Sequence, residues 1–128
     1  MAIELQMLVY AGLLAVLQIV LFVALALPQV GIPWAVGPRD KAQTLTGTGG
    51  RAQRALANMF ESLTLFAIAV LTASAAGRFG SETALAAQVY FWARVAYVPA
   101  YVFGIPWLRS LIWGVGLAAT LIIFWQIL

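Results

Sequence analysis

Apolar residues fill four stretches of the chain, and the proline, glycine and charged residues gather in the segments between them. The stretches cover residues 5–27, 55–76, 84–103 and 111–128. Because about 20 apolar residues form a helix that crosses the hydrocarbon core of a bilayer, each stretch predicts one membrane-spanning helix. Within a single membrane domain, residues 1–128, the helices are expected at about 3–27, 51–77, 83–103 and 107–128.

The segments between the stretches predict how the helices are connected. Residues 28–50 contain three prolines and five glycines and are expected to form an irregular loop, whereas 77–83 and 104–106 are short turns. Short links favour antiparallel neighbours, so the predicted fold is an all-α integral membrane protein, an up-down bundle of four transmembrane helices. The glycine-rich residues 46–50 lack the Gly-Lys-Ser/Thr ending of a phosphate loop and are interpreted as a flexible lead-in to the second helix. Pro106 suits the first turn of the last helix.

Basic residues concentrate at one end of the expected bundle. Arg78 lies alone at the opposite end, whereas the first loop and the third connection hold or adjoin Arg39, Lys41, Arg51, Arg54 and Arg109. Loops rich in lysine and arginine stay in the cytoplasm. We therefore expect a multi-pass protein of the cell membrane, with the first and third connections in the cytoplasm and both termini outside.

The composition supports a membrane protein and removes several kinds of site. Hydrophobic residues make up 64% of the chain and charged residues only 9%, against about a quarter charged in soluble domains. The chain has no cysteine and no histidine, so thiolate or histidine metal sites and a histidine general base are excluded, and no metal is expected. The net charge of +3 is too small and too scattered to indicate nucleic acid.

Two stripes of polar side chains interrupt the apolar helices. The stripe on the second helix consists of Arg51, Arg54, Asn58 and Glu61. The stripe on the third helix consists of Tyr90, Arg94, Tyr97 and Tyr101. At 100° per residue each stripe stays within about 80° of arc. Because ionisable groups inside a bilayer are costly, the stripes indicate a functional site.

Glu61 and Arg94 are expected to form a buried ion pair. Each lies ten residues from the loop end of its helix, a depth of roughly 15 Å at 1.5 Å per residue. One interpretation is that the pair only locks two helices together. The other is that both stripes line a wedge open to the cytoplasm. Its cationic donors suit a small anion with carboxylates and an amine, since arginine forks match carboxylates and Glu61 or Asn58 can accept an ammonium.

The order of these residues resembles a known family. The second helix carries Arg51-x-x-Arg54-Ala55-x-x-Asn58-x-x-Glu61-x-x-x-x-Phe66. The third carries Arg94-Val95-Ala96-Tyr97-x-x-x-Tyr101, and Arg109-Ser110 opens the fourth. With its length and helix count, the chain resembles the MAPEG family, membrane-associated proteins of eicosanoid and glutathione metabolism, in a bacterial-type form.

The resemblance implies a homotrimer that binds glutathione, as co-substrate, between adjacent subunits, with lipophilic substrates approaching from the membrane. The residues that it implies for glutathione binding are Arg51, Arg54, Asn58, Glu61, Arg94, Tyr97 and Tyr101. Arg109 resembles the arginine that faces the thiol and would stabilise the thiolate. Family members often have a proline near Thr64, where this threonine is expected to bond back to a carbonyl. A further arginine of the first helix in some members has only Arg39 as a loose counterpart.

These residues leave three classes of function open. The first is a membrane-bound glutathione transferase or peroxidase acting on lipophilic electrophiles. The second is a non-catalytic lipid-binding or scaffold protein of the same fold, which would have no need of a cation such as Arg109 beside a thiol. The third is a small proton-coupled multidrug transporter, but such carriers place their key glutamate in the first helix, and residues 5–27 carry no charge.

Overall fold

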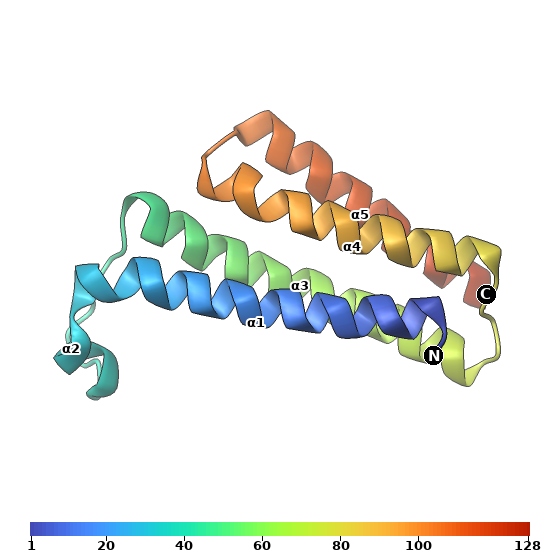
Figure 1. Ribbon diagram of the computed structural model, residues 1–128, viewed down its shortest axis with the longest axis horizontal. Helices are drawn as coiled ribbons and strands as arrows, with labels where there is room; N and C mark the ends of the chain where they lie inside the picture. Colours follow the sequence, from blue (N-terminus) through green and yellow to red (C-terminus); the bar gives the residue numbers. More distant parts are fainter.

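The computed structural model describes all 128 residues and is entirely helical. Its five helices are α1 (Ile3–Val30), α2 (Ile32–Val36), α3 (Gly47–Ala75), α4 (Ser81–Val102) and α5 (Pro106–Ile127). The four long helices run up and down in chain order, both termini lie at one end, and α2 lies at the other end (Figure 1). Pro106 occupies the first turn of α5, as expected from the sequence.

Three helices, α1, α3 and α5, are long and apolar enough to cross a membrane. The chain is therefore a membrane protein. α4 has 22 residues, as α5 does, but it contains no 18-residue stretch as apolar as those in the other three helices. It buries four of its polar residues inside the bundle, Thr83, Tyr90, Arg94 and Tyr97, whereas Ser81 and Glu82 at its start are exposed.

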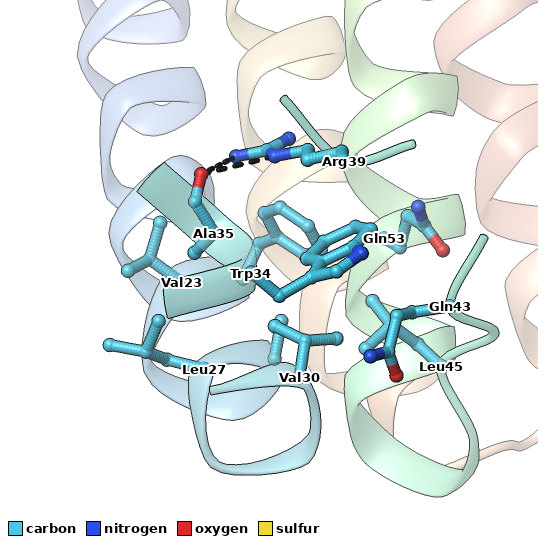
Figure 2. Close-up of a pocket in the computed structure, with 11 residues that line it drawn as sticks. Val23, Leu27, Val30, Trp34, Ala35, Arg39, Gln43, Leu45 and Gln53 are labelled. Atoms are coloured by element: carbon cyan, nitrogen blue, oxygen red, sulfur yellow. Dashed lines mark hydrogen bonds between the residues drawn. The ribbon is translucent and has the colours of Figure 1, made fainter. Parts of the chain in front are cut away.

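The expected irregular loop at 28–50 is more ordered than the sequence predicts. α1 continues past Pro28 and ends before Gly31, whose φ of 82° favours glycine. The short helix α2 follows directly. Its Trp34 lies between α1 and the returning chain, with Arg39 over the indole ring (Figure 2). A 2.6 Å hydrogen bond from Trp34 Nε1 to the carbonyl of Lys41 holds the indole against the returning chain.

The prediction of a flexible lead-in at 46–50 is wrong. Gly49 and Gly50 are buried in the first turn of α3. A Cβ built on Gly49 would lie 2.5 Å from Gln29 Nε2 and 3.1 Å from the carbonyl oxygen of Leu25. The Gln29 side chain also bonds both backbone groups of Thr46, each over 2.9 Å. Gly49 is needed because α3 begins against the end of α1, and a Cβ on Gly50 would lie 2.9 Å from the carbonyl oxygen of Leu45 in the preceding chain.

Small side chains dominate the core between the long helices. The alanines of the main core cluster are Ala11, Ala15, Ala69, Ala73, Ala86, Ala87 and Ala119. Such residues let membrane helices approach closely. At the end that holds the termini, Thr83 donates a 2.5 Å hydrogen bond to the buried carboxylate of Glu4, which ties α4 to α1.

Candidate functional site

A seam of polar side chains runs between α3 and α4. Arg94 NH1 donates to Asn58 Oδ1 over 2.9 Å, and Ser62 Oγ and the Tyr90 hydroxyl lie 3.0 Å apart. Ser62 comes four residues after Asn58 on α3, and Tyr90 comes four residues before Arg94 on α4, as expected for two antiparallel helices. Tyr90 is fully buried, with its ring stacked 3.8 Å from that of Phe66.

Arg94 is the most unusual residue of this seam. It is only 1% exposed, and its Nε and NH2 atoms have no hydrogen-bond partner. Its guanidinium carbon lies 4.1 Å from the ring centre of Tyr97. A Cβ on Gly116 of α5 would meet the Arg94 stem at 3.9 Å, an ordinary van der Waals contact, so α5 packs beside this stem. A buried cation with two free donors is costly, and an anion that reaches it would remove that cost.

The expected ion pair between Glu61 and Arg94 is wrong, because Arg94 bonds to Asn58. A 2.7 Å hydrogen bond from Arg51 Nε to the carbonyl of Val102, the last residue of α4, shows the same register. Arg94 lies eight residues before Val102 on α4. In an antiparallel pair it therefore lies opposite the residue eight positions after Arg51 on α3, which is next to Asn58. The depth estimate failed because it measured α4 from the turn at Gly104.

Glu61 lies on a neighbouring face of α3, turned toward α5. It lines a cavity of about 120 Å³ together with Ser62, Leu65, Trp113, Leu117 and Thr120. The side chain is exposed in the single chain. One turn further along, Thr64 Oγ1 donates to the carbonyl of Phe60 over 2.7 Å, which confirms the expected back-bond.

A second group of cations surrounds Tyr101 at the loop end of α4. Arg54 Nε donates to the Tyr101 hydroxyl over 3.2 Å. Arg109 of α5 places its guanidinium carbon 4.7 Å from the centre of the same ring. The rings of Tyr97 and Tyr101 are 5.5 Å apart, which connects this group to Arg94. One tyrosine thus brings together two arginines that are 55 positions apart in the sequence.

Arg51 has a different environment from the other arginines. Besides its bond to Val102, it packs 3.7 Å from the Cβ position of Gly104, whose φ is 73°. Arg51 therefore supports the turn between α4 and α5 through its Nε and the atoms next to it. Arg39 is separate from the seam as well: both of its hydrogen bonds go to the carbonyl of Ala35. The cavity of about 140 Å³ beside Arg39 and Trp34 (Figure 2) contains none of the expected site residues.

The sequence analysis did not single out Ser62. Ser62 lies four residues after Asn58 and therefore on the same face of the helix, and this spacing could have identified it as part of the polar stripe. The sequence did place Tyr90 in the polar stripe but gave it no role, and its bond to Ser62 explains why it is buried there.

Taken together, Arg54, Arg94 and Arg109 bring cationic groups from three helices close to Tyr97 and Tyr101, with Arg94 buried, Arg109 partly buried and Arg54 exposed. Arginine forks bind carboxylates in a bidentate way and tyrosines add neutral hydroxyls. The arrangement therefore suits an elongated anion with more than one acidic group.

Comparison with known proteins gives one match. The sequence pattern of the MAPEG family matches residues 7–128. No curated protein and no solved structure matches the chain. The family includes glutathione transferases and related enzymes, and its members are typically trimers that bind glutathione and lipids. With nearly its whole length matched, the chain belongs to the MAPEG family.

Proposed function

We propose that this protein is a membrane-bound, glutathione-dependent transferase or peroxidase that acts on lipophilic electrophiles. The observation that carries the proposal is the Arg94 guanidinium, 1% exposed, with two donor nitrogens that have no hydrogen-bond partner in the protein. A residue kept only to join two helices would be expected to have its donors satisfied inside the bundle. The free donors instead suit an acidic ligand.

Glutathione has the groups that this seam can bind. Its two carboxylates match the guanidinium groups of Arg54 and Arg94, with Arg51 at the rim, and its ammonium matches the Glu61 carboxylate or the Asn58 oxygen. The phenols of Tyr97 and Tyr101 supply further hydrogen bonds. These residues form the proposed binding set.

Arg109 is the proposed catalytic residue. It lies in the first turn of α5, where the helix N-terminus adds a partial positive charge to that of the guanidinium. A thiol held beside both charges loses its proton more readily than at its usual pKa of about 8.5. The thiolate sulfur then attacks the electrophilic atom of the acceptor and displaces its leaving group. Alternatively it attacks a peroxide oxygen, which breaks the O–O bond and releases an alcohol, and a second glutathione converts the resulting sulfenic acid to glutathione disulfide and water.

The proposed assembly is a homotrimer in which a neighbouring copy covers the exposed side of the seam. Glu61 and Arg54 are exposed on the single chain although α3 is a membrane-spanning candidate. Charged groups facing lipid are costly, so a second protein surface or a ligand is needed there. We further propose that α4 crosses the membrane as the fourth span, with the first and third connections in the cytoplasm and both termini outside.

Glutathione binding tests the proposal directly. The purified protein in mild detergent should bind glutathione by calorimetry and conjugate it to chlorodinitrobenzene, and its mass should correspond to a trimer. Arg94→Gln should lose binding, whereas the matched control Arg78→Gln, at the opposite end of the bundle, should retain it. Failure of the wild-type protein to bind glutathione would contradict the proposal. Binding without conjugation or peroxide reduction would instead favour a non-catalytic lipid-binding member.

A further inference from the structure

Three cavities form one groove along the exposed side of α4 and α5, away from the polar seam. Their volumes are about 180, 630 and 460 Å³. The first and second share Glu82 and Gln126 as lining residues. The second and third share Leu85, Val89 and Val115. The shared lining residues place the three cavities one after another along α4 and α5, from the end that holds the termini toward the middle of the bundle.

The lining changes from polar to apolar along the groove. The first cavity has no hydrophobic lining residue and includes both Arg78 and Glu82. The other two are almost entirely apolar. Alanines at positions such as 93, 96 and 118 leave space between the helices, while the rims carry Trp92 and Trp125, which are 64% and 74% exposed. The polar cavity therefore suits the head group of an amphiphile, and the two apolar cavities suit its hydrocarbon chain.

The groove lies where membrane lipid is the nearest partner. α5, which forms one wall, is apolar and long enough to cross a bilayer. Beyond Glu82 the lining contains no charged residue. Unlike the face of α3 that exposes Glu61, this surface needs no second protein to cover a charge. Lipid chains can cover it at no electrostatic cost.

We propose that this groove binds one zwitterionic phospholipid with an ethanolamine head group. The Arg78 guanidinium matches the phosphate, and the Glu82 carboxylate matches the ammonium. From Glu82 to Ala96 the groove follows α4 for fourteen residues, or about 21 Å. That length exceeds the roughly 15 Å depth of one leaflet, half of a 30 Å hydrocarbon core. An acyl chain that starts at the polar cavity can thus lie within the groove along its length.

Lipid retention by the intact protein tests this site. The full chain is reconstituted in nanodiscs that contain equal amounts of phosphatidylethanolamine, phosphatidylglycerol and phosphatidylcholine with identical acyl chains. Native mass spectrometry then counts the lipids that stay bound. We expect preferential retention of phosphatidylethanolamine. Arg78→Gln should reduce it about fivefold, the equivalent of the ~1 kcal/mol that a typical hydrogen bond contributes. Lys41→Gln, which removes a basic residue at the other end, is the matched control and should change nothing.

Two further variants separate the head group from the chain and from a protein partner. Glu82→Gln should keep a bound lipid but lose the preference for ethanolamine over choline. Ala96→Leu should lower the number of bound lipids without changing the oligomeric mass. Equal retention of the three lipids by the wild type, or equal losses in Arg78→Gln and Lys41→Gln, would overturn the proposal. Dissociation of the oligomer by Ala96→Leu with lipids retained would also overturn it, since the groove would then be a contact between copies.

Discussion

Replacing Asn58 by leucine tests the pairing that the structure gives to Arg94. The substitution removes a 2.9 Å hydrogen bond to a guanidinium that already has two unpaired nitrogens and is 1% exposed. A hydrogen bond to a charged group contributes about 1.5–3 kcal/mol. Removing one partner of a buried ion pair costs about 3–5 kcal/mol, and a neutral amide partner should cost less than that. We therefore expect Asn58→Leu to lower the free energy of unfolding by about 2–3 kcal/mol.

A double-mutant cycle isolates this interaction from other effects of the substitution. Unfolding in detergent by chemical denaturant is measured, without glutathione, for Asn58→Leu, Arg94→Met and the double mutant. Since the double mutant buries neither an unpaired cation nor an unpaired amide, it should be more stable than Asn58→Leu alone, with a coupling energy of at least about 1 kcal/mol. Glu61→Gln is the matched control and should cost little, because Glu61 makes no bond to Arg94. The reasoning is refuted if Glu61→Gln destabilises the protein more than Asn58→Leu does.

Three other substitutions test separate features. Tyr90→Phe removes the 3.0 Å bond to Ser62 while keeping the ring, so the free energy of unfolding should fall by about 1 kcal/mol; an unchanged denaturation midpoint would show that this bond contributes nothing. Gly49→Ala places a Cβ 2.5 Å from Gln29 Nε2, and the resulting overpacking should cost about 1–3 kcal/mol in thermal unfolding; stability equal to that of the wild type would argue against the close approach of α1 and α3. Arg109→Leu should abolish the ultraviolet absorbance of the glutathione thiolate at neutral pH and slow conjugation, with affinity largely kept. If absorbance and turnover are both unchanged, Arg109 is only a charge that anchors its loop on the cytoplasmic side.

The limits of what the sequence could predict are clearest at α3. Its polar stripe was predicted correctly as a stripe, because the angular positions of side chains around a helix depend only on residue spacing. Its beginning was not, because Gly47–Gly50 has the composition of a loop and becomes helical only where it packs against the end of α1. The contact with Gln29 that selects glycine there comes from a residue 20 positions earlier.

The partner of Arg94 shows the same division. The sequence placed Asn58 and Glu61 on one face of α3 and Arg94 on one face of α4, and it identified Arg109 by its resemblance to a family. Which side chains meet depends on the offset between two antiparallel helices, and a shift of three residues, about 4.5 Å, exchanges one partner for another. Three hydrogen bonds between α3 and α4 agree on that offset: Arg51 to Val102, Arg94 to Asn58, and the one between Ser62 and Tyr90.

The sequence by itself therefore determined the membrane environment, the four long helices and their polar stripes, because each follows from composition or from spacing within a single helix. Only the tertiary structure decided the α3–α4 register, the position of Arg109 against Tyr101 and the groove along α4 and α5. Each of these depends on distances between segments that are far apart in the chain, and packing of side chains sets those distances.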